Sequence, residues 1–356
     1  MYTNNLADVL PENADSALII SPDNRRYFTS FNSSDGFLLI TKKGSIFFTD
    51  SRYIEAAEKQ ISRCDVCEGK NFFAQIRDYL IERNAQSIAV EAGGITVSQY
   101  LRLADRSELC GFELICDGEL DKNINRIRSV KSAEEVLYIK QAQAIAEKSF
   151  LNILDFIKAG RTEKEIQLEL DYYMLKNGAE ALSFETIAVS GVNSSMPHGV
   201  PSEKPVNNGD FITMDFGAVV NGYHSDMTRT VALGSVSDEQ EHVYNVVLAA
   251  QQAAIDAVKA GVACSDGDKA ARDVISQAGY GEYFGHSTGH GVGIEIHEEP
   301  NLSPNAKGFL QKGNIVTVEP GIYLPGKFGV RIEDMVLITD EGCENLTKAE
   351  KGLVTV

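Results

Sequence analysis

The sequence predicts two α/β domains, and the second domain repeats one pattern of two helices followed by strands. A chain of 356 residues is long for a single hydrophobic core, so two domains are expected. Short apolar runs alternate with helix-like segments over residues 1–124. Residues 125–356 twice show a pair of amphipathic helices followed by β-rich sequence. This second pattern indicates an internal duplication with pseudo-two-fold symmetry.

Composition and charge narrow the class of protein. Apolar residues make up 43% and charged residues 24%, a balance typical of globular proteins. The formal net charge of −18 disfavours a nucleic-acid partner, because it repels the phosphate backbone. No apolar run approaches the roughly 18 residues of a membrane helix, and the N-terminus lacks the features of a signal peptide. We therefore expect a cytoplasmic protein without a membrane partner.

The N-terminal domain, residues 1–124, is expected to be a sheet covered by helices. Strands are expected at Ala17–Ile20, Gly36–Thr41, Ser45–Thr49, Ser87–Val90 and Phe112–Cys116, with helices around Tyr53–Ile61 and Phe73–Arg83. None of the six histidines lies here, so substrate gating or oligomerisation is a better expectation than chemistry. Cys64 and Cys67 form a lone C-x-x-C, for which an incidental surface pair is favoured over a zinc or redox site. The charged segment 121–128 is taken as the domain boundary.

Four helices are expected in the C-terminal domain, residues 125–356. The pattern S/T-x-x-E predicts helix starts at Ser132 and Thr162, and apolar residues three and four apart extend the first helix towards Gly160. The second helix is expected to end at about Asn177. The later pair is expected to run from Ser237 to about Ala260, and from Ser265 or Asp266 to just before Gly279.

The first chemical motif is a hairpin that carries two acids. Asn221-Gly222 lies between two β-prone runs and predicts a two-residue turn. Counting back from this turn places Asp215 opposite Thr228, with Asp226 on the same face of the sheet. Aspartate is depleted in strands, and two neighbouring carboxylates repel each other unless a cation or a proton lies between them. A metal or acid–base site is therefore favoured over two unrelated acids at a strand end and a turn.

Three of the six histidines, His286, His290 and His297, fall within twelve residues. The nearby glycines argue against a helix and for a close approach of the backbone to a ligand. The segment does not contain the H-E-x-x-H motif of zinc proteases. Any one of these histidines could be a packed core residue, but three together favour a functional site.

Two predicted strands near the C-terminus also carry acids. Glu319 ends an apolar strand at a Pro-Gly turn, and Glu333 interrupts another strand with Arg331 on the same face. Buried acids need partners, and for Glu333 a simple ion pair with Arg331 explains the pattern equally well. Oxygen-rich ligation with one imidazole suits Mn²⁺, Fe²⁺ or Co²⁺, with Zn²⁺ possible. Four acids and one histidine fit two divalent ions about 3.5–4 Å apart, which would share a water.

Five short motifs stand in a fixed order: Met214-Asp215-Phe216-Gly217, Ser225-Asp226-Met227-Thr228-Arg229-Thr230, Gly289-His290-Gly291, Val318-Glu319-Pro320-Gly321 and Arg331-Ile332-Glu333-Asp334. In order and spacing they resemble the aminopeptidase P and prolidase branch of the pita-bread metallopeptidases. The resemblance covers residues 125–356. Residues 1–124 resemble the smaller creatinase-like domain that precedes this fold. The resemblance implies a pita-bread (creatinase/aminopeptidase) catalytic domain and a homodimer.

The resemblance also implies a role for each candidate residue. The metal ligands would be Asp215, Asp226, His290, Glu319 and Glu333, with Asp226 and Glu333 bridging two ions, usually Mn²⁺ and often also Co²⁺. Glu319 would accept a proton from the attacking water, and His297 would hydrogen-bond the scissile carbonyl as it becomes an oxyanion. His198 would be a catalytic and substrate-binding histidine. The proline pocket would be lined by His286, Tyr323 and Arg331, whereas no role is implied for His224 and His242.

The implied activity is hydrolysis of the peptide bond before proline. Asn301 stands where several prolidases carry an arginine that suits the carboxylate of a dipeptide. We therefore expect an Xaa-Pro aminopeptidase that releases the residue before proline. An Xaa-Pro dipeptidase, or prolidase, is the alternative, and it requires another cation to read the carboxylate. The intact set of ligands disfavours an inactive binding module and a creatinase-type enzyme, and the N-terminal extension disfavours a methionine aminopeptidase.

Overall fold

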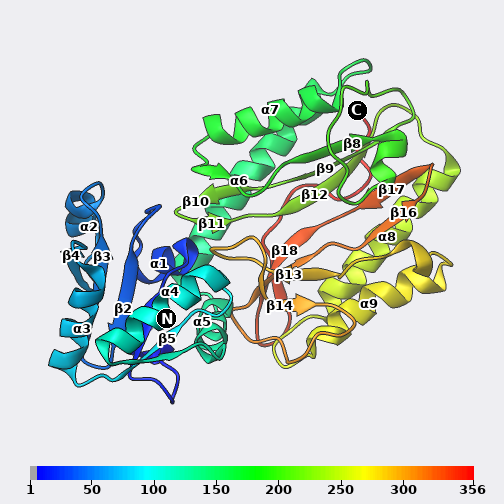
Figure 1. The fold of residues 1–356 in the computed structure, drawn as a ribbon. Coiled ribbons are helices and arrows are strands. Elements are labelled where there is room, and N and C mark those ends of the chain that lie inside the picture. Colours follow the sequence, from blue (N-terminus) through cyan, green and yellow to red (C-terminus); the bar gives the residue numbers. More distant parts are fainter. Residues whose placement is uncertain (1–5) are drawn as a thin grey trace. The chain divides into compact units, whose positions relative to one another are not determined.

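Two units of helices and strands make up residues 6–356, the part of the chain that this computed structural model describes (Figure 1). The units meet in sequence between Arg128 and Ser129. Helix α5 (Glu119–Ser129) contains the charged segment 121–128, which is therefore helical rather than a linker. The domain boundary expected at residue 124 stays a prediction. No helix in residues 6–356 is both long enough and apolar enough to cross a membrane.

The first unit contains a six-stranded sheet in the order β4-β3-β2-β1-β5-β6. Its strands are β1 (Ser16–Ile19), β2 (Phe37–Thr41), β3 (Gly44–Thr49), β4 (Asp65–Glu68), β5 (Ser87–Val90) and β6 (Glu113–Ile115). The central strand β1 pairs antiparallel with β2 and parallel with β5. Every residue of β1 and β5 is buried, as expected for strands covered on both faces of a sheet.

Helices of the first unit confirm part of the prediction. They are α1 (Pro22–Thr29), α2 (Ile54–Gln60), α3 (Phe72–Arg83) and α4 (Val97–Cys110), besides α5 and the 3-10 turn η1 (Leu6–Val9). The predicted helices correspond to α2 and α3. Strand β4 and helices α1 and α4 were not predicted. Strand β4 was missed because it is a half-buried edge strand without an apolar run. Cys67 lies on β4 and Cys64 just before it, where burial raises the pKa of the Cys64 thiol to about 12.

The second unit has two helix pairs, as the sequence predicts. They are α6 (Ala133–Phe156) with α7 (Glu163–Lys176), and α8 (Asp238–Ala257) with α9 (Cys264–Gln277). Capping boxes open three of these helices at Ser132, Thr162 and Ser237. The predicted start of α9 was wrong by a residue or two, because Ala263 is its N-cap and Ser265 lies in its first turn.

The second unit contains thirteen strands, β7 to β19. Figure 1 shows its strands between the two helix pairs. The first half contains β7 (Ala181–Leu182), β8 (Ile187–Ser190), β9 (Phe211–Phe216), β10 (Ala218–Val220), β11 (Tyr223–His224) and β12 (Met227–Ala232), with the 3-10 turn η2 (Gly191–Ser195). The second half contains η3 (Gly281–Tyr283), β13 (Gly289–Gly291), β14 (Glu298–Leu302), β15 (Ile315–Val318), β16 (Gly321–Leu324), β17 (Phe328–Arg331), β18 (Asp334–Ile338) and β19 (Cys343–Asn345). They form four sheets: β11-β10-β7 and β12-β9-β8 with three strands each, β14-β13-β15-β18-β19 with five, and β16-β17 with two.

Each half of the second unit has its own hydrophobic core. Helices α6 and α7 pack on β9 and β12 through residues such as Phe150 and Met214. Helices α8 and α9 pack on β15, β17 and β18 through residues such as Val247 and Val336. Two helices over a sheet, repeated once, give the pita-bread fold with pseudo-two-fold duplication that the sequence predicts.

The predicted hairpin register is confirmed. Asn221 and Gly222 have φ angles of 49° and 84°, the two positive values of a type I′ turn. Thr228 of β12 faces Asp215 of β9. The turn thus brings Asp226, one residue before β12, to the same end of the hairpin as Asp215.

Candidate active site

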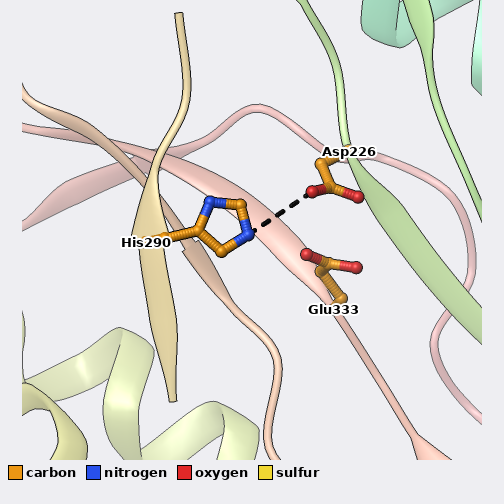
Figure 2. Close-up of side chains that lie close together, drawn as sticks. All are labelled: Asp226, His290 and Glu333. Carbon is orange, nitrogen blue, oxygen red and sulfur yellow. Dashed lines mark ion pairs between the residues drawn. The ribbon is translucent and has the colours of Figure 1, made fainter. Parts of the chain in front are cut away.

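Two carboxylates and one imidazole converge in the second unit. Asp226 precedes β12, His290 lies in β13, and Glu333 lies between β17 and β18. One side-chain atom from each lies within 4.8 Å of the others. Figure 2 shows both carboxylates beside the ring of His290, with the contact from His290 to Asp226 dashed. Three residues from separate parts of the sequence therefore form one largely buried cluster.

Glu319 and Asp215 extend this cluster. The Nε2 atom of His290 lies 3.4 Å from Glu319 Oε1 and 3.6 Å from Asp226 Oδ2. Asp215 Oδ2 accepts a hydrogen bond of 2.6 Å from Arg331 Nη2, whereas Asp215 Oδ1 is buried without a hydrogen-bond partner. All five residues line one cavity of about 730 Å³. The structure thus brings together the five residues for which the sequence predicts a metal-binding role.

The acids destabilise one another's charge. Burial, together with repulsion from neighbouring carboxylates, raises the pKa of Asp226 and of Glu333 well above the usual range. Burial raises the pKa of Glu319 to about 8, against the attraction of Arg331. Buried carboxylates in such a group stay ionised only where a cation compensates them.

The orientation of His290 also favours a cation. Burial lowers its pKa to about 4, so the ring is neutral at pH 7. Its Nδ1 donates to the backbone oxygen of Gly291 at 3.0 Å, because a carbonyl can only accept. The lone pair of Nε2 therefore faces Asp226 and Glu319, which are themselves acceptors when they are ionised. A divalent ion between them would relieve this repulsion, and backbone support of Nδ1 is usual for a metal-ligating histidine. The donor set fits divalent metal ions.

Two threonines that the sequence analysis did not single out hold the acids. Thr228 Oγ1 donates to Glu333 Oε2 at 2.7 Å, and Thr317 Oγ1 lies 3.2 Å from Glu319 Oε1. Thr317 Oγ1 also accepts from the backbone N–H of His290 at 3.1 Å. Thr228 could have been found from the hairpin register. Thr317 could have been found as the residue two positions before Glu319 on the same strand face.

Glycines permit the close strand contacts beside the cluster. A Cβ atom on Gly289 would lie 1.9 Å from the backbone oxygen of Thr317, and one on Gly217 would lie 1.9 Å from that of Ser225. Any side chain at these positions would push the backbones apart. The glycines next to His290 and after Asp215-Phe216 are therefore required by packing.

The predicted substrate histidines line the same cavity. His198 follows η2, His286 precedes β13, and His297 directly precedes β14. The rings of His297 and His290 lie edge to face with their centroids 4.3 Å apart. Asn301 also lines the cavity. A ligand in this cavity would contact the acids and the three histidines together.

Tyr323 is buried beside the cavity and connects two of the residues that line it, His286 and Arg331. It is buried and does not line the cavity, but its hydroxyl lies 2.9 Å from both Arg331 Nη1 and His286 Nε2. Burial lowers the pKa of His286 to about 4, so its Nδ1–H donates to the oxygen of Ser287 and its Nε2 accepts from Tyr323. Arg331 forms its ion pair with Asp215 rather than the pair with Glu333 considered from the sequence.

Two histidines lie elsewhere. His224 pairs with Val219 in the strand pair β10–β11 and donates its backbone N–H to Gly293. The ring of His242 packs near Tyr280, with centroids 6.1 Å apart. Neither is among the residues that line the cavity.

Comparison with known proteins identifies both units. The model of the creatinase/prolidase N-terminal domain matches residues 10–130, and that of metallopeptidase family M24 matches residues 138–340. The Xaa-Pro dipeptidase of Pyrococcus furiosus is 36% identical over 351 residues, 98% of this chain and 98% of that protein.

Solved structures share the whole fold. An Xaa-Pro dipeptidase from Bacillus anthracis is 41% identical with a TM-score of 0.92, covering 96% of this chain and 95% of that one. An X-Pro aminopeptidase from Thermotoga maritima is 39% identical with a TM-score of 0.89, covering 96% of this chain and 98% of that one. The M24 match extends over more than half of the chain. It includes every residue of the acid–histidine cluster, which consists of Asp215, Asp226, His290, Glu319 and Glu333. The chain therefore belongs to metallopeptidase family M24 and is a hydrolase.

Proposed function

We propose that this chain is an Xaa-Pro dipeptidase, which hydrolyses dipeptides whose second residue is proline. The observation that carries this proposal is a single cavity that joins the acid–histidine cluster to His198, His286 and His297. The relatives from Pyrococcus furiosus and Bacillus anthracis, described as Xaa-Pro dipeptidases, support this alternative over the aminopeptidase that the sequence favoured.

We further propose that the cluster binds two divalent ions, and that these are Mn²⁺. The proposed ligands are Asp215, Asp226, His290, Glu319 and Glu333, of which Asp226 and Glu333 would be shared. Four carboxylates and one imidazole form the hard, oxygen-rich set that suits Mn²⁺ better than Cu⁺ or structural Zn²⁺. Ions held there would supply Lewis acidity, which lowers the pKa of water and polarises a carbonyl.

The residues of the chain would position the substrate and transfer the proton. Glu319, whose carboxylate lies 3.4 Å from His290 Nε2, would accept the proton of the attacking water and deliver it to the leaving nitrogen. His297 would donate a hydrogen bond to the scissile carbonyl oxygen as negative charge develops. His198, from the loop after η2, would bind the substrate in the same cavity.

The part of the cavity lining that His286 forms suits the ring of a proline residue. Both ring nitrogens of His286 are engaged, one by Ser287 O and the other by the Tyr323 hydroxyl. The ring therefore offers carbon atoms rather than donors or acceptors to the cavity. A pyrrolidine ring is apolar, and its amide nitrogen has no hydrogen to donate in an Xaa-Pro bond. This part of the lining can therefore accept proline without leaving a polar group unpaired.

An Xaa-Pro aminopeptidase is the second candidate, favoured by the Thermotoga maritima structure. The two activities are separated by hydrolysis of Gly-Pro and of Gly-Pro-Ala-Ala by the manganese-loaded chain, with identification of the products. Cleavage of Gly-Pro with little cleavage of the tetrapeptide would support the dipeptidase. Release of glycine from the tetrapeptide at a similar or higher rate would support the aminopeptidase. Cleavage of neither by chain with bound metal would contradict the proposed proline specificity.

A further inference from the structure

We propose that Lys164, in the first turn of α7, binds the C-terminal carboxylate of the dipeptide substrate. This inference rests on the proposed dipeptidase function and supplies the cation that such an enzyme needs. Asn301, which lines the cavity, stands where the resemblance to prolidases implies an arginine. Its neutral Nδ2 donates to Glu299 Oε1 at 3.3 Å, so it offers no positive charge to a carboxylate.

The cavity is lined by two residues with a permanent positive charge, Lys164 and Arg331. Arg331 is occupied by the protein itself. Its Nη2 donates to Asp215, its Nη1 to Tyr323 OH and Pro197 O, and its Nε to Thr228 Oγ1, so four of its five N–H groups are used. Withdrawing Arg331 to bind substrate would leave Asp215 without its ion pair.

Lys164 has donors to spare. Its Nζ donates to Gln167 Oε1 at 2.7 Å, which uses one of its three N–H groups. Lys164 is half-buried, and Gln167, one turn further along α7, lines the same wall of the cavity. An ammonium group partly withdrawn from water interacts more strongly with a carboxylate than an exposed one does. The pair therefore presents an ammonium group that is oriented by Gln167, is attracted by the carboxylate of Asp171, and keeps N–H groups for a further anion.

The backbone around Lys164 is fixed to the loop that carries His198. The N–H of Lys164 donates to Ser202 O at 3.0 Å. The carboxylate of Glu163 is buried and accepts from Ser190 N, Asn193 Nδ2 and Ser202 Oγ at 2.7, 3.1 and 2.6 Å. Lys164 and the His198 loop are thus held as one piece. A preorganised cation loses little entropy when it binds substrate.

The cavity connects this cation to the reactive acids. Lys164 and Gln167 of α7, the segment 184–187 and the acid–histidine cluster all line the same space of about 730 Å³. This volume lies in the range of small-molecule sites. A dipeptide bound there would place its scissile carbonyl at the acids and its carboxylate towards α7. A longer peptide would put a neutral amide against Lys164 instead.

The test compares Gly-Pro with its carboxamide, Gly-Pro-NH₂, on the manganese-loaded chain. We expect the wild type to prefer the free acid, as measured by the ratio of kcat/KM for the two substrates. In Lys164→Gln this ratio should fall about tenfold to a hundredfold, mainly through the KM for Gly-Pro, because a charge-assisted hydrogen bond is lost. Lys164→Arg should keep most of the preference. Lys176→Gln, which removes an exposed charge at the other end of α7, should leave the ratio unchanged.

The outcomes separate the inference from the proposed function. Hydrolysis of both substrates by the wild type at similar kcat/KM would overturn the role of Lys164, whatever its variants do, while leaving Xaa-Pro hydrolysis intact. A preference for the free acid that persists in Lys164→Gln with normal bound metal would also overturn it. No hydrolysis of either substrate by metal-loaded wild type would overturn the proposed function and the inference with it.

Discussion

At the scale of single residues, the candidate site is a group of acceptors in which Arg331 is, within residues 6–356, the one cation beside four carboxylates. Asp226, Glu319 and the lone pair of His290 face one another, and only Asp215 has a cation, Arg331. The acids could be predicted because aspartate and glutamate inside strands are unusual. The pairing of Arg331 with Asp215, which joins residues 116 positions apart, could not be predicted from spacing. Lys164 was missed because a lysine in the first turn of a helix is ordinarily a solvated charge.

Replacement of a shared acid should separate metal binding from stability. Asp226→Asn should lose most of its bound metal and its hydrolytic activity. In a chelator at pH 8, however, the variant should be about 1–2 kcal/mol more stable than wild type, because one buried like charge is gone. Metal analysis and urea unfolding measure the two effects, with exposed Asp105→Asn as the control. A variant that turns over normally would disprove the ligand assignment.

His297 should affect turnover without affecting metal content. Its ring packs against His290 and lines the cavity, but it lies beside the acids rather than among them. His297→Ala should lower kcat by roughly a hundredfold, as expected when one donor to a developing oxyanion is removed. His242→Ala serves as a remote control. Loss of metal in His297→Ala would mean that this residue is a ligand.

At the scale of elements, local sequence signals predicted where helices start. The conformation of the loop with His198 depends on tertiary contacts instead. Capping boxes located α6, α7 and α8, and the Asn-Gly turn set the hairpin register. Helix α1 carried a signal that was overlooked, Ser21 as N-cap followed by Pro22. The loop with His198 has no regular structure beyond η2, and its conformation depends on Glu163, which the sequence marks only as a helix-start residue.

The hydrogen bonds that the Glu163 carboxylate accepts should keep the loop with His198 ordered. Glutamine at this position can accept through one oxygen only, and its amide would oppose the donors of Ser190, Asn193 and Ser202. We expect Glu163→Gln to be destabilised by about 2 kcal/mol and to raise the KM for Gly-Pro. Amide hydrogen exchange should become faster over residues 190–202. Equal exchange in Glu163→Gln and in Glu169→Gln, which changes an acid further along α7, would argue against this anchoring.

At the scale of the whole molecule, the metal-free chain carries an electrostatic cost that depends on pH. Glu319 holds its proton up to about pH 8 when folded, whereas its ordinary pKa is 4.5. The folded state then binds more protons than the unfolded state, so stability falls as pH rises between these values. His286 and His290, whose pKa values are lowered to about 4, act in the opposite direction, but only below pH 6.5. Between pH 6.5 and 8 the acids alone determine the sign.

Metal-free chain should therefore lose stability between pH 6.5 and pH 8. The expected loss is at least about 1 kcal/mol, since each proton contributes roughly 1.4 kcal/mol per pH unit. Urea unfolding in a chelator measures it. With saturating Mn²⁺ the trend should disappear or reverse, because ligation requires the deprotonated acids. Metal-free chain that becomes more stable over this range would show that the acids do not repel one another in the folded state.

The origin of the proposed ligands in both halves of the second unit has a mechanical consequence. Asp215 and Asp226 come from the first half, whereas His290, Glu319 and Glu333 come from the second. The halves also touch through the hydrogen bond from Glu333 N to Thr228 O at 3.1 Å. Ions bound at this seam would act as a removable cross-link between two separately packed cores. Their departure would loosen the joint itself, while each core would keep its own packing.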